Sequence, residues 1–485
     1  MKFIPLFASV LCGLFFTLSV VRAIGEREWI NNDGKTIRAK FVSANAQTVT
    51  LSMEGKAYVF ELSSLSPESR ALAGELAKSQ PAFRYARARA LSKTQQKAVE
   101  QALAESFSVT RKEDYDFADL AKFDALLPDN EEVFRSLAWN AYRKGGALDE
   151  MQPDHKAGKV VSGKYVSPYV VRQVGKMPEG GWGLVIAMHG GGKAPKQVND
   201  SQWRIMQRYY KDHPEQGGYL YLALRASTDA WNGFYTGYVY PLIARLIRQM
   251  LVCEKVNPDK VYLIGYSHGG YGAFAIGPKM ADRFAAIHSS AAAPTDGQSS
   301  PKNLLNTPFT FMIGERDLAY GRLKRCLAFD QAVKRLRADG KDKYPVRMFL
   351  QKGFGHGGLP DRDQLAKILP AVRNPIPNSI VWEPTDSVVH RFSWLEIPEP
   401  AKKQLVKAAK KGNRFEIKLT GIESLELYLD ERMIDYRKPV VIEVNGKVVL
   451  ERSLIPSLPV LCRSLLERGD PRFAFASKVR VANGP

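Results

Sequence analysis

Short apolar runs recur between residues 160 and 374, and they alternate with stretches that have helical spacing. The runs predict five strands: Trp182 to Met188, Tyr219 to Leu224, Val261 to Ile264, Phe309 to Ile313 and Val346 to Leu350. Helices are predicted between them, as at Pro241 to Glu254 and Arg322 to Ala338. Such alternation predicts an α/β domain over 160–374, with a doubly wound, mainly parallel sheet whose working residues follow the carboxyl ends of the strands.

The segment 24–68 has a different period, because its apolar residues alternate with polar ones as in half-buried strands. The alternating positions are Val49, Leu51, Met53, Tyr58, Phe60 and Leu62. Turn signals stand at Asn32-Asp33-Gly34 and Glu54-Gly55. We therefore expect a small N-terminal β module.

Residues 69–150 have helical spacing and are expected to be a helical linker region. A helix start is indicated at Asp129 to Glu132, where acidic residues occupy the first turn, and Gly145-Gly146 is expected to end that helix. We assign this region to packing or bridging rather than to catalysis.

Residues 376–485 are expected to be a β-rich C-terminal domain, with Pro375 and Pro377 marking its boundary. Strands are predicted at Phe415 to Leu419, Leu425 to Leu429, Val440 to Val444 and Lys447 to Leu450. Asn445-Gly446 joins the last two and is a strong hairpin signal. No chemical motif is visible in this part of the chain.

The N-terminus has the pattern of a secretory signal peptide over residues 1–23. Lys2 precedes a long apolar stretch, and Val21-Arg22-Ala23 offers small or apolar residues where a signal peptidase cleaves. A retained membrane anchor is the alternative, since the apolar run approaches spanning length. We expect cleavage, no membrane span afterwards, and a secreted, periplasmic or cell-surface location.

The net charge of +20, from 70 basic and 50 acidic residues, indicates a solvated basic surface or an anionic partner such as a cell-surface polymer. No nucleic-acid-binding signature accompanies the dispersed lysines, so we expect no nucleic-acid partner. The densest basic run, Lys402 to Lys411, is interpreted as one exposed helix face. Cys253, Cys326 and Cys462 follow the signal segment and allow at most one disulfide bond.

Gly265-Tyr266-Ser267-His268-Gly269 carries the strongest chemical signal, because it follows an apolar strand and precedes a credible helix. A G-x-S-x-G sequence in this context is typical of a nucleophile elbow, in which a strained turn exposes the serine hydroxyl. We therefore predict that Ser267 is a catalytic nucleophile.

A serine hydroxyl needs a base to attack a carbonyl carbon. His356 lies in a Gly-rich loop just after the strand that ends at Leu350, and we predict that it is the general base. Asp317 follows the strand between Ser267 and His356 in the sequence Gly-Glu-Arg-Asp, and we predict that it orients the histidine, with Glu315 as the fallback.

The strand Trp182 to Met188 ends in His189-Gly190-Gly191-Gly192, a pattern whose backbone N–H groups bind a developing oxyanion. We predict N–H donors at Gly190, Gly191 and His268, and a structural role for the His189 side chain. The sequence has no phosphate-binding Gly-Lys-Ser/Thr or G-x-G-x-x-G motif after a strand and no metal-binding motif, so we expect no cofactor and no metal.

HGGG, GYSHGG, GERD and GFGHGG, in this order over residues 189–358, resemble the α/β-hydrolase superfamily, in particular its secreted esterase and prolyl-oligopeptidase-like branch. This resemblance implies a Ser267–His356–Asp317 triad and no cofactor. Unlike prolyl oligopeptidases, the chain has no room or repeats for a propeller. The segment around Trp29, Asp33-Gly34-Lys35 and Leu62 to Ser66 resembles an SH3-like module of the Sla homology type, which implies interaction with an unknown partner or spacing rather than chemistry.

Trp231 and Phe234 follow the strand that ends at Leu224, and they are placed to line a substrate mouth, although packing is an equal alternative. The leading interpretation is a hydrolase of carboxylic esters, with an acylated polysaccharide or another polymer as the candidate substrate. A serine peptidase with the same triad is the first alternative. A binding protein with a degenerate hydrolase domain is the second.

Overall fold

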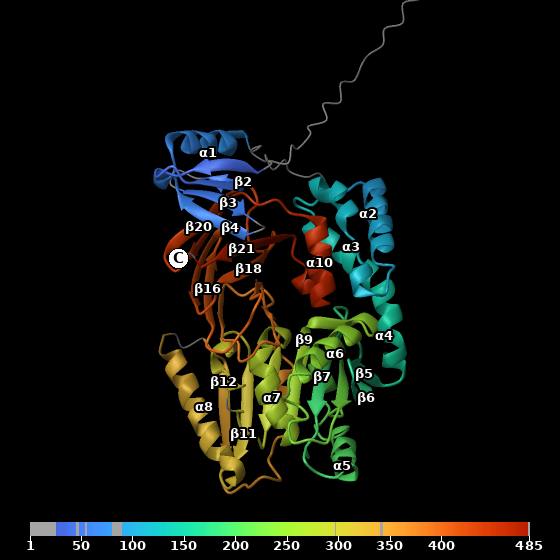
Figure 1. Cartoon of the computed structure of the whole chain (residues 1–485). Coiled ribbons are helices and arrows are strands. Elements are labelled where there is room, and N and C mark those ends of the chain that lie inside the picture. The colour runs from blue at the N-terminus through green and yellow to red at the C-terminus, as the bar shows by residue number, and fades with distance from the viewer. Residues whose placement is uncertain are drawn as a thin grey trace, which may run out of the picture. The chain divides into compact units, whose positions relative to one another are not determined.

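The computed structural model of the chain describes residues 26–44, 48–53, 56–79, 90–295, 297–339 and 343–483 (Figure 1). The chain divides into two compact units, Met1–Ala82 and Phe83–Pro485. The predicted signal peptide at residues 1–23 lies outside the described residues. Among the described helices, none has the length and hydropathy that crossing a membrane requires.

The first unit is a four-stranded antiparallel sheet with one helix. Its elements are β1 (Arg27–Ile30), β2 (Thr36–Ala44), β3 (Thr48–Met53), β4 (Lys56–Glu61) and α1 (Pro67–Ser79), with the strands paired in sequence order. Trp29 is fully buried and stacks on Phe41. Ala73 and Leu76 of α1 join the same core. The first unit therefore extends through α1 to Ala82 and does not end at residue 68 as expected, whereas its SH3-like character stays a prediction.

The second unit contains an eight-stranded sheet in the order β12-β11-β10-β9-β7-β8-β6-β5. All neighbours from β12 to β8 are parallel, and β6 and β5 are antiparallel additions at one edge. The strands are β5 (Lys159–Ser162), β6 (Tyr165–Val174), β7 (Trp182–Met188), β8 (Tyr219–Leu224), β9 (Val256–Tyr266), β10 (Ala286–Ser290), β11 (Phe309–Gly314) and β12 (Val346–Gln351). The expected mainly parallel α/β sheet is present.

Helices cover both faces of this sheet because its strand residues are buried on both sides. On β7, Leu184, Ile186 and Met188 belong to the core beneath α6, α7 and α8, whereas Val185 and Ala187 belong to the core beneath α5 and α9. The helices are α5 (Lys196–Met206), α6 (Val239–Cys253), α7 (His268–Lys279), α8 (Arg322–Leu336) and α9 (Gln364–Ile368). The sheet is therefore doubly wound.

The helices that precede the sheet pack on a helix from the other end of the second unit. They are α2 (Lys93–Ser106), α3 (Glu131–Lys144) and α4 (Gly146–Lys156), and their partner is α10 (Leu458–Arg468). Phe134, Ala138 and Tyr142 form the buried face of α3, close to the face that the sequence predicts. Residues from Lys93 onward are thus part of a compact unit rather than a linker. The predicted end of this helix at Gly145-Gly146 is confirmed, because α3 ends at Lys144 with Gly145 as its C-cap and Gly146 begins α4.

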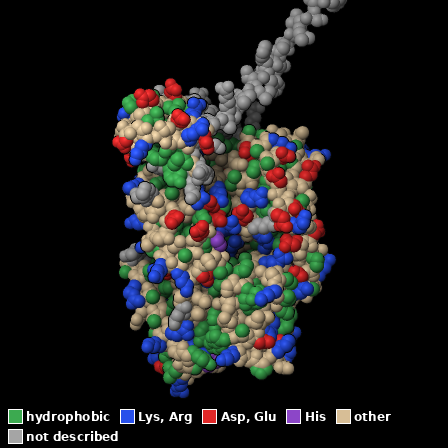
Figure 2. All heavy atoms as spheres, viewed as in Figure 1, with side chains coloured by type: hydrophobic (Ala, Val, Ile, Leu, Met, Phe, Trp, Pro, Cys, Tyr) green, Lys and Arg blue, Asp and Glu red, His purple; other side chains and the backbone are tan. Residues whose placement is uncertain are grey.

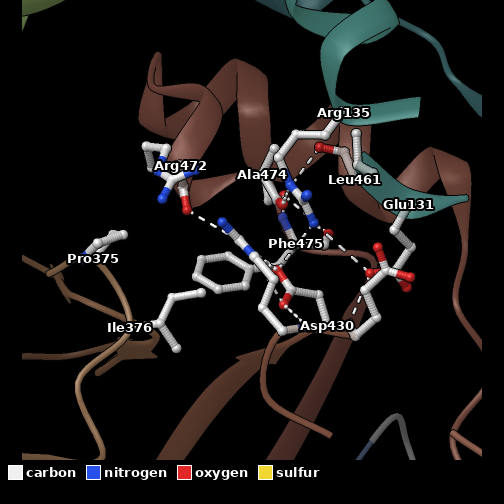
Figure 3. Close-up of polar contacts among 12 residues, drawn as sticks. Glu131, Arg135, Pro375, Ile376, Asp430, Leu461, Arg472, Ala474 and Phe475 are labelled. Carbon is white, nitrogen blue, oxygen red and sulfur yellow. Dashed lines mark hydrogen bonds and ion pairs between the residues drawn. The ribbon is translucent and has the colours of Figure 1, made fainter. Parts of the chain in front are cut away.

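A buried ionic network fastens α3 to the C-terminal strands (Figure 3). The Arg135 guanidinium donates to the Ala474 carbonyl at 3.1 Å and to Asp430 at 3.3 Å. Glu131 is fully buried, and its carboxylate accepts from the backbone N–H of Glu431 at 2.9 Å. Burial, and then the charge of Asp430, raise the pKa of Glu131 from 4.5 to about 8.

Two further sheets form the C-terminal part, in the orders β13-β16-β17-β19-β20 and β14-β15-β18-β21. The strands are β13 (Ser379–Trp382), β14 (Arg391–Phe392), β15 (Leu395–Glu396), β16 (Leu405–Lys411), β17 (Arg414–Thr420), β18 (Ser424–Leu429), β19 (Val440–Val444), β20 (Lys447–Arg452) and β21 (Ser477–Ala482). The predicted Asn445-Gly446 turn joins β19 to β20, with positive φ at both residues. The two sheets share one hydrophobic core with the α/β sheet, so this region lies within the second unit.

The basic run Lys402 to Lys411 is not a helix face, because most of it forms β16. Val406 and Ala408 are buried between exposed or half-buried lysines, as the period of a strand requires. On the visible face of the second unit, Lys and Arg side chains are interspersed with Asp and Glu (Figure 2). Cys253, Cys326 and Cys462 are free, so the one disulfide that the sequence allows is not formed.

Candidate active site

Ser267 occupies the sharp turn between β9 and α7. Its backbone has φ 52° and ψ −111°, a conformation that non-glycine residues rarely adopt and that stores strain. The flanking glycines are sterically required: a Cβ on Gly265 would lie 2.1 Å from the Gly269 carbonyl oxygen, and one on Gly269 would lie 2.2 Å from the Met188 carbonyl oxygen. The N–H of Ser267 donates to the Ser290 carbonyl at 2.9 Å and fixes the turn on β10.

Ser267, His356 and Asp317 are brought together as the sequence predicts. Ser267 Oγ lies 3.0 Å from His356 Nε2, and His356 Nδ1 lies 2.8 Å from Asp317 Oδ2. A carboxylate can only accept, so Nδ1 carries the proton and Nε2 is free to accept from the serine hydroxyl. Asp317 is 2% exposed, whereas the His356 side chain is 42% exposed. The hydrogen-bonded series therefore leads from a buried carboxylate to a histidine that solvent can reach.

Arg322, the first residue of α8, holds the other oxygen of the Asp317 carboxylate. Its Nε and Nη2 lie 2.8 and 2.7 Å from Oδ1, which leaves Oδ2 for the histidine. Burial alone would lower the pKa of Arg322, but hydrogen bonding and attraction to Asp317 outweigh it and raise the pKa. The Asp317 carboxylate is thus held in one orientation by a buried cation.

The loop that carries His356 is anchored at three points by its neighbours. The Tyr266 hydroxyl donates to the His356 carbonyl at 2.7 Å. Glu315 accepts from the Gly353 N–H at 2.9 Å, and the Arg316 N–H donates to the Phe354 carbonyl at 2.8 Å. In this structure Glu315, the fallback acid, therefore supports the histidine loop and does not contact the imidazole.

The loop after β7 places Gly190 beside Ser267. A Cβ on Gly190 would lie 3.7 Å from Ser267 Cβ, and Gly191 has a φ of 107° that favours glycine. Asn199 of α5 is buried and accepts from the Gly192 N–H at 2.8 Å, which fixes the loop. Among the described residues, the backbone N–H groups of Gly190 and Gly191 have no hydrogen-bond acceptor. The N–H of His268 is at the first position of α7, where a helix leaves its N–H groups unpaired.

Two buried histidines support this loop from below. His189 Nε2 accepts from the Ala226 N–H at 3.1 Å, so its proton is on Nδ1, which lies 2.5 Å from the Gly190 carbonyl. Burial lowers the pKa of His189 to about 4, and burial together with His189 lowers the pKa of His268 to about 3. Both rings are therefore neutral at physiological pH and have structural roles.

The two candidate substrate-lining residues have different environments. Phe234 is 1% exposed, and its ring lies 4.9 Å from that of His268 and 5.1 Å from that of His189, so it packs beneath the site and does not line a mouth. Trp231 is 37% exposed, and its ring lies 5.6 Å from the Tyr271 ring and 5.2 Å from the Tyr320 ring. Of the pair, Trp231 remains as a substrate-facing candidate.

Sequence reasoning missed Arg322, Asn199 and the role of Tyr266. Each of the three makes a hydrogen bond to a site residue or its loop that exists only in the folded chain, and no sequence motif marks any of them. In the part of the chain that the structure describes, no group of three or more His, Cys, Asp or Glu side chains is arranged to hold a metal ion.

No known protein-family profile and no curated protein matches the chain. Among solved structures, esterase PE8 is 15% identical with a TM-score of 0.29, and the match covers 41% of this chain and 99% of that one. A ferulic acid esterase is also 15% identical with a TM-score of 0.30, covering 42% of this chain and 97% of that one. A putative dipeptidyl aminopeptidase IV from Bacteroides ovatus is 14% identical with a TM-score of 0.34, covering 44% and 35%. Similarities this low do not discriminate between activities.

Proposed function

We propose that the chain is an exported serine hydrolase of the α/β-hydrolase type that cleaves carboxylic esters through an acyl-enzyme. The observation that carries the proposal is the hydrogen-bonded series from Asp317 through His356 to Ser267, on a serine held in a strained strand-to-helix turn. A turn of this kind is costly to fold, and strain of this kind is concentrated at functional sites.

In the proposed reaction, His356 Nε2 takes the Ser267 proton while Oγ attacks the ester carbonyl carbon. Asp317 stabilises the resulting imidazolium and is itself held in place by Arg322. The negative oxygen of the tetrahedral intermediate is bound by the N–H of His268 and by the N–H groups of Gly190 and Gly191. His356 then returns the proton to the leaving alcohol, and water hydrolyses the acyl-enzyme by the same steps in reverse order.

The proposal predicts that a fluorophosphonate probe labels the purified mature protein and that Ser267→Ala abolishes the label. The probe reacts only with an activated serine, so labelling tests the nucleophile without knowledge of the substrate. Ser289→Ala is a matched control, because Ser289 lies on β10 and is fully buried. A folded wild-type protein that is not labelled would contradict the proposal and favour the binding-protein alternative.

Ester cleavage is then separated from peptide cleavage by assaying both substrate types on unlabelled protein from the same preparation. The triad can protonate an amine as well as an alcohol, so the same residues serve either reaction. We propose esters because an amide demands more of the leaving-group step, and no element of the described chain is identified as a peptide-gating propeller. Export and an anionic cell-surface partner remain part of the proposal on the strength of residues 1–23 and the net charge of +20.

A further inference from the structure

A row of aromatic rings begins at the buried Tyr271, which is 4% exposed and one helical turn from the nucleophile, and ends at the exposed Tyr320 in the loop of the catalytic acid. Tyr271 is four residues after Ser267 on α7, and its N–H donates to the Ser267 carbonyl at 2.9 Å. The Trp231 ring lies 5.6 Å from the Tyr271 ring and 5.2 Å from the Tyr320 ring, and Tyr320 is three residues after Asp317. We call Trp231, Tyr271 and Tyr320 the ring strip.

Two rings of the strip reach solvent: the middle ring, Trp231, is 37% exposed, and the end ring, Tyr320, is 68% exposed. Leu318, two residues before Tyr320, is 67% exposed. Burial of apolar surface stabilises a fold, so the Tyr320 side chain contributes little to it.

Tyr320 is also held in an unfavourable backbone conformation. Its φ of 54° and ψ of 20° lie in the left-handed region, which a tyrosine rarely adopts, and the next residue, Gly321, has a φ of 64°. The Arg322 guanidinium lies 5.2 Å from the Tyr320 ring centroid while it binds the Asp317 carboxylate. Arg322 therefore contacts both the exposed Tyr320 ring and the catalytic acid Asp317. The strained backbone of Tyr320 lies beside this acid, and strain of this kind is concentrated at functional sites.

We propose that the ring strip binds a ring carried by the substrate, so that the enzyme prefers esters whose acyl or alcohol part contains such a ring. This inference rests on the proposed ester hydrolysis. Aromatic rings stack on one another. The C–H face of a sugar ring also packs on Trp and Tyr rings, so the shared chemistry is a ring with one apolar face. The openness of the strip suits a ring that is part of a larger molecule, because small-ligand sites enclose most of their ligand.

The test compares kcat/KM for ring esters with that for a matched ester without a ring. The ring substrates are butyl phenylpropanoate, benzyl butyrate and a butyryl methyl glucoside, and butyl butyrate is the substrate without a ring. These arms distinguish an aromatic acyl group, an aromatic alcohol and a sugar alcohol. Trp231→Ala and Tyr320→Ala should lower kcat/KM for at least one ring ester by roughly three- to ten-fold relative to butyl butyrate.

Three further variants separate ring binding from packing. Tyr320→Phe keeps the ring and should retain the preference. Tyr320→Gly removes the ring and also the backbone strain, so it should lose the preference while its Tm stays at or above the wild-type value. Leu318→Ala removes an equally exposed apolar side chain without a ring and should leave the preference unchanged.

The inference is overturned if the wild type shows no preference for any ring ester, or if Tyr320→Gly lowers the Tm and reduces kcat/KM equally on all four esters. Fluorophosphonate labelling of every variant keeps this outcome distinct from failure of the proposed function. Labelled variants that lose only the ring preference support the ring strip. Labelled enzyme without a ring preference refutes the strip alone, and unlabelled wild type refutes the hydrolase itself.

Discussion

At the scale of single residues, the carboxylate of Asp317 serves two partners through its two oxygens. Oδ2 accepts from His356, and Oδ1 is held by Arg322. Because Asp317 and Arg322 are 2% and 5% exposed, neither charge has water to replace a lost partner.

Arg322→Met should therefore lower the free energy of unfolding by about 3–5 kcal/mol, the cost of leaving a buried charge unpaired. Its kcat should fall while KM changes little, since Arg322 positions the acid and does not contact the substrate carbonyl. Arg322→Lys keeps the charge and should recover part of both losses. Urea unfolding and steady-state kinetics measure the two effects, and a Met variant with wild-type kcat would contradict the positioning role.

Residue-level prediction from sequence succeeds where a motif carries the information. The surroundings of Ser267, Gly190 and His356 are short contiguous patterns whose backbone requirements are visible in the sequence. Arg322 and Phe234 show where prediction from sequence fails. Arg322 is an ordinary arginine at a helix start. The Phe234 ring packs on His189, in the loop after β7, and on His268, at the start of α7. Such pairings form only when the elements are packed.

At the scale of elements, the loop after β12 must hold a histidine although it contains four glycines, at 353, 355, 357 and 358. Glu315 compensates for that freedom by accepting from the Gly353 N–H. The structure therefore separates the roles of the two acidic residues in the Gly-Glu-Arg-Asp sequence.

Asp317→Asn should lower kcat by about 10⁴-fold, because an amide does not hold the imidazole in the required tautomer. Glu315→Gln keeps an oxygen acceptor for Gly353 and should remain within about ten-fold of the wild type, since a typical intramolecular hydrogen bond contributes about 0.5–1.5 kcal/mol. The two variants are compared by kcat/KM on one ester. A larger loss in the Gln variant would make Glu315 the acid.

Predicted elements agree with the structure where the pattern is unambiguous. β7, β8 and β19 have the predicted bounds, and the hairpin at Asn445-Gly446 is confirmed, because continuous apolar runs and a turn with positive φ are local signals. The predicted helix face at Lys402 to Lys411 was wrong, because the strand β16 has only two buried side chains, Val406 and Ala408, to reveal its period. α10 was not predicted, since its apolar face is short and follows a long series of strands.

At the scale of the whole molecule, the buried network of Figure 3 makes stability depend on pH. The pKa of Glu131 is raised in the folded state, so its favourable contribution is complete below pH 4.5, its unfolded value, and is lost as the pH rises through about 8. Wild-type protein should lose on the order of a few kcal/mol of unfolding free energy between these limits.

Glu131→Gln should flatten this dependence, because an amide does not ionise. Its free energy of unfolding, measured with urea at several pH values, should change less than that of the wild type. Glu132→Gln is the matched control on the same turn: its side chain pairs with Arg135 but is 68% exposed, so this variant removes a carboxylate that is not buried, and its stability should keep the wild-type pH dependence. Parallel curves for wild type and Glu131→Gln would refute the assignment.

The packing of α3 on α10 has a consequence for biosynthesis. The ribosome synthesises α3 before the entire α/β sheet and all of the C-terminal strands, whereas α10 follows every one of these strands except β21. At roughly 5–20 residues per second, the apolar face of α3 waits tens of seconds for its partner. The nascent chain therefore has to be kept from aggregating during that interval, and the second unit completes its core only after α10 has been translated.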